Sequence, residues 1–284
     1  MARKNRIPVK GLDSVHKVMP FLMNNRCDAE VYMAEEIDVT NLLKYLEKKN
    51  EGLIKEDRIN VFHSINTAMA KTIYHRPLLN RYIQGKRFFD REEISLSFIA
   101  KRQFTEDAED MIIRLVVKEN DTIDTLKEII LKQVRKSRSN SSAGMNGFLD
   151  FITKGPKIFI SFLVWVIKSL DYFGLLPESF MEMDPNYSTV LLTNLGSIKC
   201  NQAYHHLNNY GTNSIVVAIG TIHKKEVIID DKKEIRDIVE IGFTIDERIA
   251  DGFYFAKSIK LFKKILEMPE SLELEIKEKI DDEL

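Results

Sequence analysis

Helix-type and strand-type hydrophobic patterns alternate along this chain of 284 residues, and this alternation restricts the fold more than any other feature. Apolar residues recur at helical spacing in Val61–His75, in Ile123–Val134 and again from about Gly252. In Val239–Ile245 every second residue is apolar, which is typical of a strand. We therefore expect an α/β fold, in which helices pack over one sheet, and a single domain over residues 1–284.

Shorter signals complete the predicted order of elements. Asp13 and Ser14 precede an N-terminal helix, which Pro20 is expected to shorten. Hairpin turns are predicted at Gly85–Lys86 and near Asp230–Asp231. Further strands are expected in the segments 112–117, 188–193 and 214–220.

Three other segments have a distinctive composition. Residues 137–147 are rich in serine, asparagine and glycine, which predicts a flexible loop, and residues 273–284 form a short acidic tail. Residues 157–173 form an apolar helix, and burial is the first interpretation. A trimer contact or a surface that touches a membrane are the alternatives. The apolar run 158–167 would rise only about 15 Å, half of a bilayer core, so it does not span a membrane.

The charge balance excludes several classes of protein. Lys and Arg number 42 against 43 Asp and Glu, giving a net charge of −1, so we expect no nucleic-acid partner. The basic N-terminus lacks the apolar core of a signal peptide. Cys27 and Cys200 lie far apart, which favours two reduced thiols and a cytoplasmic location.

Two short segments carry residues suited to chemistry. The predicted corner after the strand at Val239–Ile245 places Glu247 and Asp251 four residues apart, with Arg248 between them. Paired carboxylates can act as acid and base, but acids at a helix start also cap exposed amides. The second segment, Thr193–Gly196, follows an earlier strand. Residue types alone leave both interpretations of the corner open.

These segments resemble the catalytic domain of the dihydrolipoamide acyltransferases of 2-oxoacid dehydrogenase complexes and, more distantly, chloramphenicol acetyltransferase. That family has Asp-His-Arg-x-x-Asp-Gly at the corner and Ser-Asn-Leu-Gly at the earlier strand end, where this chain has DERIADG (246–252) and TNLG (193–196). The stretch RPLLN (76–80) and the helix FYFAKSIKLFKKILEMPE (253–270) are also similar. The resemblance extends from about His16 to Leu272.

The resemblance implies a chloramphenicol acetyltransferase-like mixed sheet flanked by helices, assembled as a homotrimer. Coenzyme A and a small-molecule acyl acceptor would then enter channels between subunits. By position, Thr193 would donate a hydrogen bond to the oxyanion, as the family serine does, because its hydroxyl is retained. Asp251 matches the family's Asp and is a predicted catalytic-site residue with Glu247 and Thr193, although in the acetyltransferase this Asp is chiefly structural. Asn194 and Arg248 also match and are accessory candidates. The coenzyme A-binding residues cannot be carried over.

Glu247 occupies the place of the motif histidine, which is the general base in the family. An unperturbed Glu is about two pKa units less basic than His, a loss of roughly 3 kcal/mol in driving force for proton removal. His205 and His206 are accessory candidates for a replacement base. These histidines and Cys200 also raise a zinc site, but no second cysteine or carboxylate cluster lies at ligand spacing, so no metal is expected.

Two hypotheses follow from this departure. The first is a free-standing, coenzyme A-dependent acyltransferase with an altered base. The second is a non-catalytic trimeric relative that serves as a binding or assembly module. Because the resemblance begins near His16, we expect no lipoyl domain, lipoyl attachment or subunit-binding domain in this chain.

Overall fold

A computed structural model describes residues 5–101, 110–139 and 154–280. Its main sheet has six strands in the order β2-β9-β8-β7-β5-β6. The sheet is mixed, because β7 runs parallel to both β8 and β5 whereas the other neighbours are antiparallel. The strands span β2 (Glu30–Asp38), β5 (Ile94–Lys101), β6 (Asp110–Val117), β7 (Val190–Asn194), β8 (Ile215–Ile229) and β9 (Lys232–Asp246).

A second, three-stranded sheet lies beside the main one, in the order β1-β4-β3. Its strands are β1 (Ile7–Pro8), β3 (Arg81–Gln84) and β4 (Arg87–Asp90), and the predicted turn at Gly85–Lys86 joins the last two. The expectation of one sheet is therefore wrong in this detail. The predicted turn at Asp230–Asp231 is confirmed, and both residues have positive φ, as a tight hairpin turn requires.

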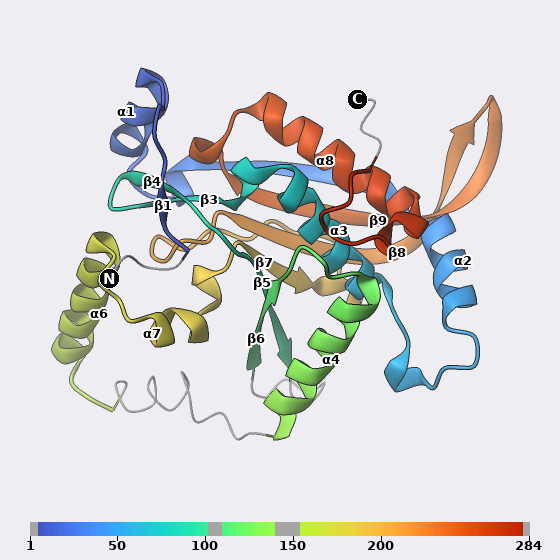
Figure 1. Cartoon of the computed structure of the whole chain (residues 1–284), viewed down its shortest axis with the longest axis horizontal. Helices are drawn as coiled ribbons and strands as arrows, with labels where there is room; N and C mark the ends of the chain where they lie inside the picture. Colours follow the sequence, from blue (N-terminus) through green and yellow to red (C-terminus); the bar gives the residue numbers. More distant parts are fainter. Residues whose placement is uncertain (1–4, 102–109, 140–153, 281–284) are drawn as a thin grey trace.

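Helices cover one face of the main sheet (Figure 1). α3 and α8 lie against each other at its centre, with α2 and α4 beside them. Their bounds are α2 (Thr40–Lys49), α3 (Val61–His75), α4 (Ile123–Ser139) and α8 (Gly252–Glu267). α3 has the predicted bounds and is buried along most of its length, and α8 buries its predicted apolar face against the sheet. The hydrophobic core lies between these helices and the sheet.

Among the described residues, three further helices lie away from this layer: α1 (Ser14–Leu22), α6 (Lys157–Phe173) and α7 (Glu178–Met183). Asp13 caps α1 as predicted, but Pro20 lies inside the helix and does not shorten it. α4 extends into the predicted loop as far as Ser139, and the part of that loop from residue 140 lies outside the described residues. The acidic tail packs on the protein through Ile276, which is fully buried.

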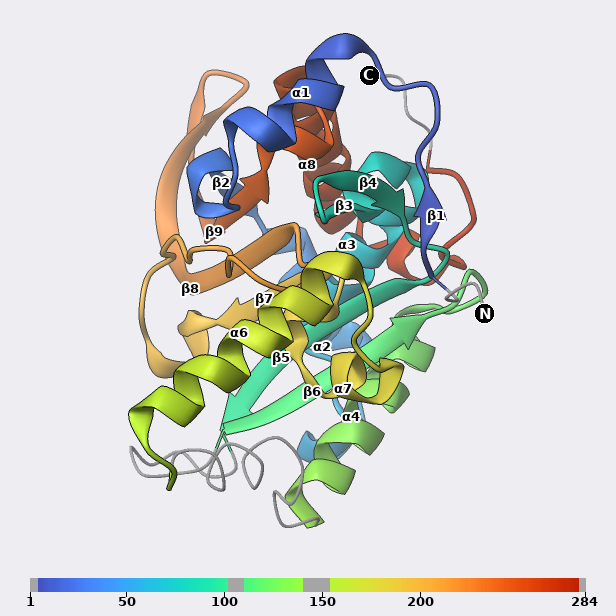
Figure 2. The same cartoon turned by 90° about the vertical axis from the view of Figure 1, so that its left-hand side faces the viewer.

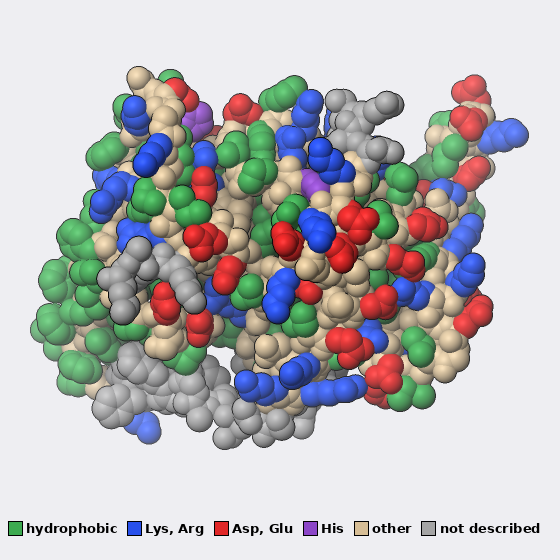
Figure 3. All heavy atoms as spheres, viewed as in Figure 1, with side chains coloured by type: hydrophobic (Ala, Val, Ile, Leu, Met, Phe, Trp, Pro, Cys, Tyr) green, Lys and Arg blue, Asp and Glu red, His purple; other side chains and the backbone are tan. Residues whose placement is uncertain are grey.

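The prediction that residues 157–173 form a buried helix is wrong. α6 runs along the outside of the protein, and hydrophobic side chains gather over it at the left edge of the molecule (Figures 2 and 3). Trp165 is 64% exposed. Asp171 is the one buried residue of this helix, where it accepts hydrogen bonds from Gln84 and Tyr187, so a polar anchor attaches α6 to the protein. No helix of the described residues is long and apolar enough to cross a bilayer.

Candidate functional site

A buried ion pair fixes the corner between β9 and α8. Asp246 ends β9 and is 0% exposed, and Arg248 is 3% exposed. The Arg248 Nε and Nη2 atoms donate to the two oxygens of Asp246 at 2.7 Å each, and Nη1 donates to the carbonyl of Met23 at 2.7 Å. Such a bidentate ion pair fixes the conformation of both side chains and of the turn to which they belong.

Glu247 lies between these partners, at the start of the short 3₁₀ turn Glu247–Ile249, and is half-buried. Its carboxylate has no hydrogen bond or ion pair within the described part of the chain. Arg248 does not bind it, because the guanidinium is directed to Asp246 and Met23. Among the described residues, the Glu247 carboxylate is therefore left without a partner.

Asp251 has a structural role at the same corner. It is the N-cap of α8, where its carboxylate accepts a hydrogen bond from the Tyr254 amide at 2.7 Å. Capping by a carboxylate satisfies an orphan amide and suits the positive end of the helix dipole. The capping interpretation thus holds for Asp251, whereas Glu247 has no such bond.

The segment Thr193–Gly196 ends β7 and turns sharply. Asn194 accepts a hydrogen bond from the Ser197 amide at 3.2 Å and so caps the following turn. Gly196 allows a close approach, since a Cβ there would lie 2.5 Å from the carbonyl oxygen of Gly220. The hydroxyl of Thr193, which is half-buried, makes no hydrogen bond to any described residue. Asn194 and Gly196 shape this turn, and the Thr193 hydroxyl is left unbonded.

One protomer does not bring Thr193 and Glu247 together. Thr193 pairs with Ala218, and Ala218 pairs with Gly242, so Thr193 is level with Gly242 across two strand spacings. Asp246, which precedes Glu247, lies four residues further along β9. Strand geometry puts these positions about 13 Å apart along the sheet and about 10 Å apart across it, or about 16 Å in total. The two side chains cannot act on one group within one copy.

The predicted accessory histidines lie elsewhere. His205 is exposed and has no bond to Glu247. His206 Nδ1 lies 2.8 Å from the carboxylate of Glu30, the first residue of β2. Cys27 completes a group with these two residues, in which the potential ligand atoms of all three lie within 4.8 Å of one another. Sequence spacing did not indicate this group, because Cys200 is the cysteine that lies near the histidines along the chain.

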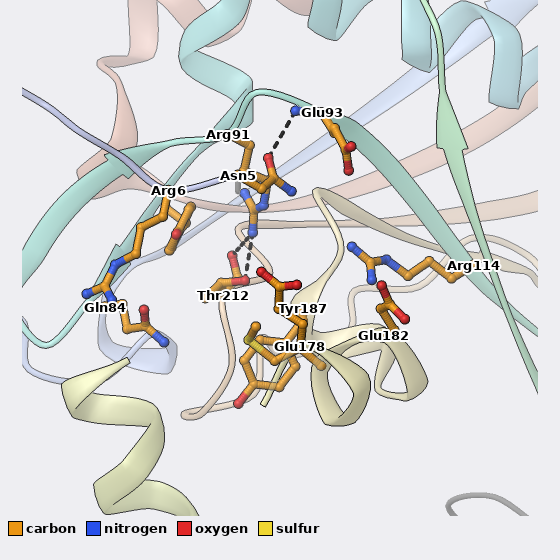
Figure 4. A pocket seen from close by; sticks show the side chains of 12 residues that line it. Asn5, Arg6, Gln84, Arg91, Glu93, Arg114, Glu178, Glu182, Tyr187 and Thr212 are labelled. Atoms are coloured by element: carbon orange, nitrogen blue, oxygen red, sulfur yellow. Dashed lines mark hydrogen bonds between the residues drawn. The ribbon is translucent and has the colours of Figure 1, made fainter. Parts of the chain in front are cut away.

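A cavity of about 310 Å³ contains none of the predicted site residues. Arginines and glutamates line it, and Figure 4 shows Arg91 at its centre, bonded to Thr212. Burial lowers the pKa of Arg91 to about 9, and its guanidinium stacks over Tyr82 at 4.3 Å. Arg248 instead borders a second cavity of about 240 Å³, which Lys86 and Lys168 also line. Of these two cavities, the second adjoins the corner.

Comparisons with known proteins identify relatives of this fold and sequence. The family model for the catalytic domain of 2-oxoacid dehydrogenase acyltransferases matches residues 4–103 and 179–274, more than half of the chain. The comparison with curated proteins gave no match.

Solved structures share the fold. A probable dihydrolipoamide acetyltransferase from Listeria monocytogenes has a TM-score of 0.60 at 20% identity, with 92% of this chain and 94% of that chain covered. The dihydrolipoamide acetyltransferase of Azotobacter vinelandii has a TM-score of 0.61 at 14% identity, with 93% of each chain covered. A chloramphenicol acetyltransferase has a TM-score of 0.55 at 13% identity, with 94% of this chain and 99% of that chain covered. The expected chloramphenicol acetyltransferase-like fold is confirmed.

Proposed function

Because this chain belongs to the family of 2-oxoacid dehydrogenase acyltransferase catalytic domains, we propose that it transfers an acyl group between coenzyme A and a thiol or hydroxyl of a small-molecule acceptor. Glu247 is the general base in place of a histidine, and Thr193 donates to the oxyanion. One observation carries this assignment. The neighbours Asp246, Arg248 and Asn194 are bonded within the fold, whereas the Glu247 carboxylate and the Thr193 hydroxyl have no partner among the described residues.

The chemistry follows from these two groups. The Glu247 carboxylate removes the proton from the acceptor as its sulfur or oxygen attacks the thioester carbonyl. The carbonyl oxygen becomes an oxyanion, which accepts a hydrogen bond from Thr193. When the tetrahedral intermediate collapses, the carbon–sulfur bond to coenzyme A breaks and its thiolate takes the proton back from Glu247.

The distance between the two groups supports a trimer. Since Thr193 lies about 16 Å from Asp246, the residue before Glu247, in one copy, a complete site needs Glu247 of one copy beside Thr193 of the next. The outer part of the β8–β9 hairpin projects from the protein, with Ile228 72% and Ile235 70% exposed (Figure 1). A two-stranded arm is marginally stable alone, which favours a neighbouring copy as its support. Coenzyme A would lie between the copies.

The relative from Azotobacter vinelandii is consistent with these roles. A serine, a histidine and an asparagine of that enzyme have been investigated for their role in its catalytic mechanism, and the last two are four residues apart. Glu247 and Asp251 have the same spacing here. We also place the protein in the cytoplasm, because both cysteines are free and exposed.

The second candidate function is a non-catalytic module that binds or assembles other molecules. Two observations favour it. A carboxylate stands in place of the expected histidine, and α6, with its exposed apolar face, belongs to the part of the sequence that separates the two segments matched by the family model. Such an apolar face could be covered by another subunit of a trimer or by a membrane surface. Under this hypothesis the corner residues are retained for folding alone.

Substitution of Glu247 separates the two functions. Glu247→Gln should abolish acetyl transfer from acetyl coenzyme A to dihydrolipoamide, and Glu247→His should raise it as the pH passes about 6.5, where imidazole becomes a free base. Glu270→Gln, at an exposed carboxylate away from the corner, is the matched control and should leave the rate unchanged. If the wild type and the histidine variant are equally inert while remaining trimeric, the binding-module hypothesis is favoured.

A further inference from the structure

Three side chains of types that bind metals meet beside β2, two of them close in the sequence and the third far away. Cys27 lies in the turn before β2, Glu30 begins the strand, and His206 belongs to the connection between β7 and β8. One sulfur, one oxygen and one nitrogen atom lie within 4.8 Å of one another. We propose that Cys27, Glu30 and His206 bind one zinc ion, contrary to the expectation from the sequence that the protein takes no metal.

The environment of Glu30 supplies an independent reason for a cation there. Its side chain is only 1% exposed, and no lysine or arginine forms an ion pair with it in the described part of the chain. Its oxygens accept from the Leu207 amide and the Tyr32 hydroxyl, each at 2.5 Å. A buried carboxylate is normally paired with a cation, and its one ionisable ion-pair partner among the described residues is the exposed His206. A metal ion would complete the balance of charge.

The spacing of the ligands fits a tetrahedral ion after a small adjustment. Zinc bonds of about 2.0–2.3 Å place neighbouring ligand atoms roughly 3.3–3.7 Å apart. The His206 Nδ1 atom now lies 2.8 Å from Glu30, so this pair must open by less than about 1 Å. The pairs with the Cys27 sulfur lie within 4.8 Å, so they must close by no more than about 1.5 Å. His206 is 76% exposed on its connecting segment and can make this movement. With three protein ligands, the fourth position is left to water.

Neighbouring groups hold the carboxylate in place. The Tyr32 hydroxyl donates to Glu30, which raises the pKa of Tyr32 to about 12, and the ring of Tyr204 packs on Tyr32. Burial, followed by the charge of Glu30, also raises the pKa of the Cys27 thiol. Zinc binds the thiolate form of cysteine, so binding would release the proton of the Cys27 thiol.

The zinc site and the proposed acyl-transfer site are separate sets of residues. Glu30 pairs with Asp246 across the strands β2 and β9, so the zinc site lies beside the corner that carries Glu247. None of its three ligands is assigned to proton transfer or to the oxyanion. Zinc binding can therefore be tested without reference to activity.

The chain supplies matched controls for the test. A calorimetric titration of the full chain with zinc chloride should show that one zinc ion binds per chain. Because loss of an outer-sphere partner alone costs about 10–100-fold in affinity, Cys27→Ser and His206→Ala should each weaken binding at least tenfold. Cys200→Ser and His205→Ala, at the other cysteine and the adjacent histidine, should not. Cobalt(II) should give a thiolate-to-metal charge-transfer band that Cys27→Ser abolishes.

Several outcomes would overturn the proposal. These are the absence of saturable binding at one equivalent, unchanged affinity in both ligand variants, or an equal loss in the two controls. Cys27 and His206 are exposed, so their replacement should leave the fold intact, which circular dichroism of the metal-free variants checks.

Discussion

Replacement of Arg248 by methionine should destabilise the protein by about 3–5 kcal/mol, because it leaves a buried carboxylate without its partner. Asp246 is 0% exposed and receives both short bonds from Arg248. The variant also removes the hydrogen bond from Nη1 to Met23, a further loss of about 1 kcal/mol. Methionine retains much of the length of the side chain, so the loss reports mainly on charge and hydrogen bonding.

Urea denaturation at one fixed protein concentration measures this loss, since the stability of the proposed trimer would depend on concentration. Lys233→Met is the matched control. It removes an ion pair with Glu226 in which the side chains are 74% and 58% exposed, and the expected loss is no more than about 1 kcal/mol. The double variant Asp246→Leu with Arg248→Met should recover much of the stability, because it removes the buried charge as well.

Two results would refute this reasoning. Arg248→Met could cost less than about 1 kcal/mol, in which case Asp246 finds another partner or is solvated. Arg26 is one alternative, since burial lowers its pKa while the charge of Asp246 acts to raise it. The double variant could also be no more stable than Arg248→Met alone, which would mean that the shape of the pair, and not its charge, supports the corner.

Three further predictions concern pH, assembly and turnover. Burial lowers the pKa of His63 to about 4, and its Nδ1 accepts a hydrogen bond from the Asn60 amide, so the folded protein holds this histidine neutral. The contribution of neutral His63 to stability is therefore present above about pH 6.5 and is lost as the pH falls towards 4. When the pH is lowered from 7 to 5, the free energy of unfolding of His63→Gln, measured in urea, should fall by about 2 kcal/mol less than that of the wild type. His205→Gln is the control and should behave like the wild type. Light scattering at micromolar concentration should give a trimer, and a stable monomer would contradict the shared site. Thr193→Val should lower turnover by about 10²–10³, and an unchanged rate would place the oxyanion elsewhere.

Elements with local hydrophobic periodicity could be predicted from the sequence. Val61–His75 is α3 with the expected bounds, and α8 buries the predicted stripe and ends before Pro269. The turn at Asp230–Asp231 was equally predictable, because short polar residues tolerate positive φ. In each case the determining interactions lie within a few residues of one another.

Other features depend on contacts between distant segments. β2 was not predicted, since acids such as Glu35 and Glu36 interrupt its apolar alternation, and its pairing with β9 is what defines it as a strand. The exposure of α6 could not be predicted either, because apolar composition does not say which surface covers a helix. The group of Cys27, Glu30 and His206 forms only where the connection after β7 reaches the start of β2.

The resemblance to the acyltransferases depends on motifs in which most residues have bonds that the fold needs in any case. Arg248 binds Asp246, Asp251 caps α8, and Asn194 caps the turn after β7. These contacts would be kept in a catalyst and in a binding module alike, because each satisfies a buried or orphan polar group. The discrimination between the two functions therefore falls on the residues without such bonds. These residues are Glu247 and Thr193. Substitution of Glu247 distinguishes the two functions more clearly, since a carboxylate there keeps the corner intact and changes only the group that would take the proton.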